Sequence, residues 1–174
     1  MIPTIAEVDD IESKGGACLG ESFAMLQRRW ESGGRDRETA LRLLFLCWYG
    51  CCEPPDCTGL PGKVEAQLVC EAFDYLGGQS SSDPEVCFAV VIMAALFPYC
   101  MGSEDKWTEI GANMLARAKS AVDCLSVSVF GGRGAYGAYF GHMLAREKAA
   151  NKQLEPTTFS LLAKKSPRHS LGGG

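Results

Sequence analysis

The stretch that decides the fold is DPEVCFAVVIMAALFP, residues 83–98. Asp83 is a good N-cap, because its carboxylate can accept hydrogen bonds from the free N–H groups of a first helical turn. Pro84 suits the first helical position, and Glu85 places negative charge at the positive end of the helix dipole. A helix that is apolar on every side must be surrounded, and this run is shorter than the ~20 residues that cross a bilayer. The pattern therefore predicts a central apolar helix, at about residues 84–97, buried inside a helical bundle.

Apolar residues spaced by threes and fours predict further helices around this one. They fall at about residues 21–31, 36–52, 63–76, 103–125 and 135–152, with a short last helix after Pro156. Residues 53–62 hold three prolines and two glycines, which cannot continue a helix. Residues 127–129 alternate like a strand, without an evident partner strand. The predicted fold class is all-α, a single-domain bundle of six or seven helices.

Composition and charge set the organisation of the chain. A length of 174 residues fits one domain, and we expect an acidic lead-in at 1–17, a helical domain at 18–165 and a disordered basic tail at 166–174. The formal charge of -4 argues against a protein that coats nucleic acid by bulk charge. From His142 onward there are six Lys or Arg and two acids, a balance of +4, so the preceding part carries -8. An acidic body with a basic C-terminal region can meet an anionic partner or a neighbouring copy.

Nine cysteines are many for this length, and the number is odd. The N-terminus has neither the basic nor the apolar segment of a signal peptide, so we expect an intracellular, reducing setting with free thiols. Four of the cysteines cluster in sequence and are the weak candidates for a zinc site: Cys47, Cys51, Cys52 and Cys57. They form no C-x-x-C pair, and the competing interpretation is that they are buried thiols. We expect no cofactor and no metal.

Residues 132–137, GRGAYG, match the G-x-G-x-x-G pattern of dinucleotide-binding turns. Such a unit needs a second strand and usually a carboxylate about 20 residues on, and no other βαβ pattern is present. The alternatives are a nucleotide-binding turn and a glycine-rich turn that packs or contacts another subunit. Arg133 with the N-terminus of the following helix can also hold a single phosphate or carboxylate.

The best candidate for contacting an anion is the basic and aromatic stretch at residues 133–152. Its basic side chains would bind phosphates and its tyrosines would stack on bases. The competing interpretation places the tyrosines in the core and the charges on a solvated face. The sequence contains no persuasive catalytic set, since His142 has no evident partner and the carboxylates are scattered. The candidate contact residues are Arg133, Tyr136, Tyr139, Arg146, Lys148 and Lys152.

The segment FGGRGAYGAYFG, residues 130–141, leading into MLAR at 143–146, resembles the Gly-Arg…Ala-Tyr-Phe segment of nucleoproteins of negative-strand RNA viruses. In size and make-up the chain also resembles small all-helical structural proteins of segmented negative-strand RNA viruses, such as the orthomyxo-like Tilapia lake virus. Matrix proteins of that group are helical, self-associate and lie between membrane and ribonucleoprotein. The net acidity of this chain departs from their usually basic character.

The leading functional hypothesis is a non-enzymatic, matrix-like viral structural protein that self-associates. Its basic C-terminal region would contact ribonucleoprotein, a membrane surface or a neighbouring subunit, and no small-molecule substrate is expected. One alternative is an RNA-binding accessory protein, and another is a small nucleotide-binding enzyme that uses the turn at 132–137. The expected location is intracellular, in host cytoplasm or nucleus and in the virion, without a transmembrane segment.

Overall fold

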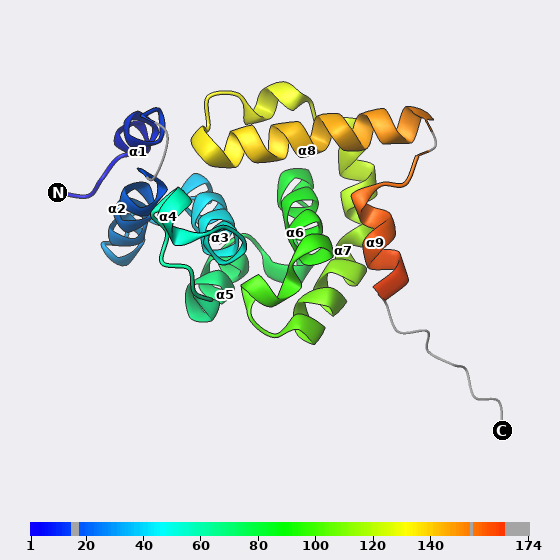
Figure 1. Ribbon diagram of the computed structural model, residues 1–174, viewed down its shortest axis with the longest axis horizontal. Coiled ribbons are helices and arrows are strands. Elements are labelled where there is room, and N and C mark those ends of the chain that lie inside the picture. Colours follow the sequence, from blue (N-terminus) through cyan, green and yellow to red (C-terminus); the bar gives the residue numbers. More distant parts are fainter. Residues whose placement is uncertain (15–17, 154, 166–174) are drawn as a thin grey trace.

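The computed structural model describes residues 1–14, 18–153 and 155–165, and in these ranges the all-α class is confirmed, with helices and turns but no strand. Figure 1 shows α8 crossing over one end of α6 and α3, with α7 and α9 beside α6. The α-helices are α1 (Ile5–Glu12), α2 (Leu19–Glu31), α3 (Arg37–Cys52), α4 (Pro55–Thr58), α5 (Ala66–Tyr75), α6 (Pro84–Leu96), α7 (Glu104–Cys124), α8 (Gly134–Gln153) and α9 (Thr158–Lys165). The 3-10 turns are η2 (Gly78–Ser80), η3 (Pro98–Met101) and η4 (Val127–Phe130).

Side-chain caps fix where several helices begin. The Asp83 carboxylate accepts from the backbone N–H groups of Glu85 and Val86, as its place before Pro84 predicts. Ser103 accepts from the N–H of Lys106 at the start of α7 in the same way. These local bonds satisfy N–H groups that have no partner inside the helix, so the observed starts lie close to the predicted ones.

Helix α6 is buried along nearly its whole length. Each residue from Glu85 to Ala95 is buried, and α6 packs mainly on α7 and α9. Phe88 meets rings from three other segments: Phe130, Phe140 and Phe159. The predicted helix extends one residue too far, because Phe97 lies after the end of α6 and is 39% exposed.

Three segments outside the predicted helices contain helical turns. Residues 127–129 belong to a 3-10 turn, η4, rather than to a strand, because the turn packs against α8. The loop at 53–62 contains the one-turn helix α4, which Pro55 opens and Gly59 closes at φ 72°. The lead-in at 1–17 contains α1, whose Val8 is fully buried, so this segment joins the core. The predicted tail at 166–174 lies outside the described residues.

In the described residues, no helix is both long and apolar enough to span a membrane.

Candidate functional site

Arg133, the first predicted anion contact, already binds two carboxylates of this chain. Its guanidinium donates to Glu85 at 2.5 Å and forms a short ion pair with Glu38. The Arg133 side chain is only 16% exposed. Its guanidinium carbon also lies over the Tyr136 ring, 4.8 Å from the ring centroid. The expectation that Arg133 offers its charge to an external phosphate is therefore corrected, because Glu38 and Glu85 occupy its donors.

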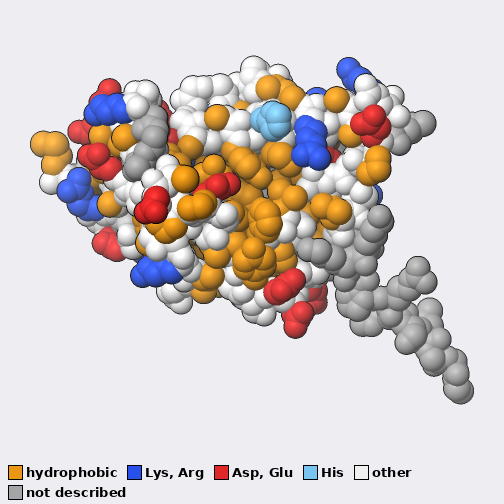
Figure 2. Space-filling view, viewed as in Figure 1, with side chains coloured by type: hydrophobic (Ala, Val, Ile, Leu, Met, Phe, Trp, Pro, Cys, Tyr) orange, Lys and Arg blue, Asp and Glu red, His pale blue; other side chains and the backbone are white. Residues whose placement is uncertain are grey.

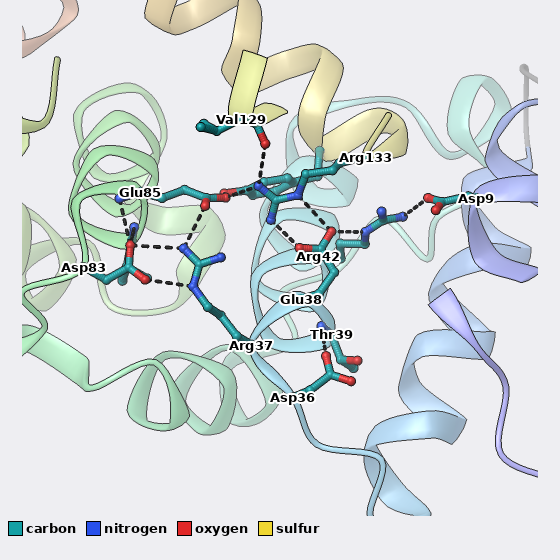
Figure 3. A network of polar contacts seen from close by, with 12 residues as sticks. Asp9, Asp36, Arg37, Glu38, Thr39, Arg42, Asp83, Glu85, Val129 and Arg133 are labelled. Atoms are coloured by element: carbon teal, nitrogen blue, oxygen red, sulfur yellow. Dashed lines mark hydrogen bonds and ion pairs between the residues drawn. The ribbon is translucent and has the colours of Figure 1, made fainter. Parts of the chain in front are cut away.

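The ion pairs of Arg133 belong to a network that joins four helical segments (Figure 3). Arg37 donates to Asp83 at 2.8 Å and to Glu85 at 2.7 Å, which ties α3 to the start of α6. Arg42 is buried in α3 and pairs with Glu38 at 2.7 Å and with Asp9 of α1 at 2.7 Å. Burial opposes the charge of Glu38, but hydrogen bonds from Arg133 and Arg42 hold its pKa below the ordinary value of 4.5.

Two of the three glycines of the G-x-G-x-x-G pattern, Gly134 and Gly137, are required by packing, whereas Gly132 has open space around it. A Cβ at Gly137 would lie 2.1 Å from the Phe130 carbonyl oxygen, and Gly134 has φ +55° with the Glu12 carboxylate against it. The N–H of Ala135, at the start of α8, donates to Glu12 Oε2 at 2.6 Å. The helix N-terminus thus holds a carboxylate, as its chemistry predicts, but the carboxylate comes from α1.

Of the two predicted stacking tyrosines, Tyr136 lies inside the fold and Tyr139 is half-buried. Tyr136 is 1% exposed and donates its hydroxyl to Glu85 at 2.6 Å, and burial raises its pKa well above 10. Its ring has no free face for a base, so the stacking prediction for Tyr136 is corrected. Tyr139 is half-buried between Trp48 and Tyr49, and burial raises its pKa to about 12.

The remaining basic candidates lie on the second half of α8. Arg146 and Lys152 are exposed and Lys148 is half-buried. Lys148 and Lys152 border a shallow pocket that Asp123 of α7 also lines. These three cations are the predicted anion contacts that the structure leaves accessible, and one carboxylate lies beside two of them.

The sequence cluster of four cysteines does not form one site. Cys47 faces the core, where burial raises its pKa to about 12, whereas Cys57 is exposed on α4. In the described ranges, no three His, Cys, Asp or Glu side chains converge as a metal site would need. Instead, Cys52 Sγ lies 3.6 Å from Cys100 Sγ of η3. This pair is not visible in the sequence pattern, because its members are 48 residues apart in the chain.

Four aromatic residues near this thiol pair are linked by ring contacts with one another or with Trp48, and we define them as the aromatic face: Tyr49, Phe97, Tyr99 and Tyr139. Phe97 and Tyr99 are 39% and 49% exposed, and their ring centroids lie 6.1 Å apart. Buried Trp48 supports the face from below, since its ring meets Phe97 at 6.0 Å and Tyr139 at 5.5 Å. Its indole N–H also donates to the Phe97 carbonyl at 3.2 Å. Figure 2 shows hydrophobic side chains gathered across the middle of the face of the molecule in view.

Comparison with known proteins adds no relative: no family model, curated protein or solved structure matches the chain.

Proposed function

We propose that the chain is a non-enzymatic, matrix-like assembly protein whose copies associate through the aromatic face. The observation that carries the proposal is the exposure of two neighbouring rings: Phe97, which packs on the buried Trp48, and Tyr99, which contacts Phe97. Large rings that are anchored from below lose little conformational freedom when a partner covers them. Aromatic residues are enriched in the cores of protein interfaces, where charged residues are depleted.

A second copy is the occupant that fits this face. None of its four side chains is charged, and the charges beside it are of both signs, Glu53 near Tyr49 and Arg146 near Tyr139, so it does not select a partner with a strong charge of one sign. In a twofold dimer the same patch lies on both subunits, so an aromatic patch needs no complementary surface elsewhere. The chain has a net charge of -8 before His142 and of +4 from His142 onward, and these opposite charges supply a second, salt-sensitive attraction between copies. The same basic region is the proposed contact for a ribonucleoprotein or a membrane surface.

Size-exclusion chromatography with light scattering, at rising protein concentration and at low and high salt, tests the association. We expect the wild-type mass to rise above the monomer, and the double variant Phe97→Ser/Tyr99→Ser to stay monomeric. The matched control is Val127→Ser/Val129→Ser, which removes two side chains that are each 42% exposed on η4. The control should associate like the wild type. A wild-type monomer at every concentration, or equal loss in both double variants, would contradict the proposal.

A second candidate function is RNA binding, which the exposure of Arg146 and Lys152 beside Lys148 favours. Three phosphate contacts on single-stranded RNA predict a log–log salt slope of about −2. The triple charge reversal to Glu at these positions should abolish that slope. A matched triple reversal at Lys14, Arg28 and Lys63, which are all exposed, changes the net charge equally and should leave RNA binding intact. Equal loss in both triple variants would assign the binding to bulk charge.

A further inference from the structure

Two thiols meet where the end of α3 contacts η3. Cys52 is the last residue of α3, and Cys100 lies in η3 among the side chains that form the aromatic face. Their Sγ atoms are 3.6 Å apart, and Cys52 Sγ also lies 3.2 Å from the Trp48 carbonyl oxygen. A disulfide has an S–S distance of ~2.05 Å, so closure needs an approach of roughly 1.5 Å. Side-chain rotation at a helix end and a short turn can supply a movement of this size.

We propose that Cys52 and Cys100 are an oxidation site, at which a peroxide converts the two thiols into an intramolecular disulfide. Cys100 is fully buried, whereas Cys52 is half-buried, so the oxidant reaches Cys52 first. Cys51 lies beside the same buried thiol and is the competing partner. The contact between the two sulfur atoms assigns the bond to Cys52, and this assignment stands whether or not the chain self-associates.

The chemistry proceeds in two balanced steps. The Cys52 thiolate attacks one oxygen of hydrogen peroxide, the O–O bond breaks, and with one proton the products are a sulfenic acid and water. The Cys100 thiol then attacks the sulfenic sulfur, an S–S bond forms, and hydroxide leaves and takes the thiol proton as a second water. Overall, two thiols lose two electrons and two protons while one peroxide is reduced to two waters. An added dithiol reductant reverses the bond by thiol–disulfide exchange.

The bond would tie α3 to η3 across residues 53–99. Because Phe97 and Tyr99 are carried by the same short segment as Cys100, oxidation would fix the backbone under the exposed rings.

The test uses the full chain treated with hydrogen peroxide, after which remaining thiols are blocked with N-ethylmaleimide under denaturing conditions. Non-reducing proteolysis and tandem mass spectrometry then identify the joined cysteines. The variants are Cys52→Ala and Cys51→Ala. The control is Cys57→Ala, which removes an exposed cysteine outside the pair. Circular dichroism shows that each variant is folded before treatment, and dithiothreitol should return the cross-linked peptide to its two halves.

We expect the Cys52–Cys100 cross-link in the wild type, in Cys51→Ala and in Cys57→Ala, and its loss in folded Cys52→Ala. A cross-link that persists in Cys52→Ala through Cys51 would overturn the assignment. So would a wild type that is oxidised to sulfinic acid, or stays reduced, without any disulfide at Cys100.

Discussion

Replacing Glu85 by Gln perturbs the charged network at the residue on which it converges. Glu85 is 6% exposed and accepts from Arg133 at 2.5 Å, from Arg37 at 2.7 Å and from Tyr136 at 2.6 Å. A neutral amide keeps the shape, but its NH2 group has to face either the Arg37 guanidinium or both the Arg133 guanidinium and the Tyr136 hydroxyl. The substitution therefore removes one charge and at least one charge-assisted hydrogen bond.

The expected loss in the free energy of unfolding depends on which ion pairs remain after the substitution. A hydrogen bond to a charged group contributes ~1.5–3 kcal/mol, and stripping one partner from a buried ion pair costs ~3–5 kcal/mol. Here Arg133 keeps Glu38 and Arg37 keeps Asp83, so neither cation is left alone. We expect Glu85→Gln to lower the free energy of unfolding by about 2–3 kcal/mol. Tyr136→Phe removes one donor only and should cost about 1–1.5 kcal/mol.

Urea unfolding followed by tryptophan fluorescence measures both changes, because Trp30, Trp48 and Trp107 are all buried. Because Tyr136 and Glu85 contact each other, the double variant should cost less than the sum of the two single variants. The exposed Glu109→Gln is the control and should leave the midpoint unchanged. A Glu85→Gln protein within about 0.5 kcal/mol of the wild type, the range of ordinary surface changes, would refute the structural role given to the network.

Three further outcomes are expected. The pKa of Glu38 is lowered in the folded state, so its contribution is present above its ordinary pKa of 4.5 and is lost as the pH falls through the folded value. Glu38→Gln should therefore flatten the loss of stability that occurs as the pH falls below about 4.5 in urea titrations, and an unchanged pH profile would speak against the ion pairs. Gly137→Ala would place a Cβ 2.1 Å from the Phe130 carbonyl oxygen, and overpacking of this kind should lower the free energy of unfolding by at least about 2 kcal/mol. Gly132→Ala has open space around it and φ +71°, so only backbone strain of about 1 kcal/mol should appear, and equal effects in the two variants would contradict the packing account. Burial, together with Cys51 and Glu53, raises the pKa of Cys52 to about 11, against the opposing effect of the contact with Cys100. The initial rate of disulfide formation should thus rise about tenfold per pH unit from pH 7 to 9, and a rate independent of pH would show that another group reacts first.

The sequence predicts the helices well because their signals are local. Asp83 and Ser103 act as caps within three residues of the groups they bond, and the apolar run between Val86 and Ala95 has to be buried wherever it lies. Residues 127–129 show the limit of this reasoning. Their alternation fits a strand, but packing against α8 decides the local structure, and that contact is not visible from the pattern.

The candidate site was less predictable, because its contacts join distant parts of the chain. Arg133 and Glu38 are 95 residues apart in sequence, and Ala135 and Glu12 are 123 apart. The residue types indicated an anion at the start of α8, and the structure places the Glu12 carboxylate of the same chain there. The exposure of Phe97 was hidden by its place at the end of an apolar run, since the helix ends one residue earlier.

Hydrogen–deuterium exchange of dilute and concentrated protein measures most directly where copies of the chain meet. The proposed contact predicts slower exchange at high concentration in residues 96–102 and around Tyr49, with little change on the exposed side of η4. Protection that appears elsewhere while residues 96–102 exchange equally at both concentrations would contradict the assignment of the aromatic face.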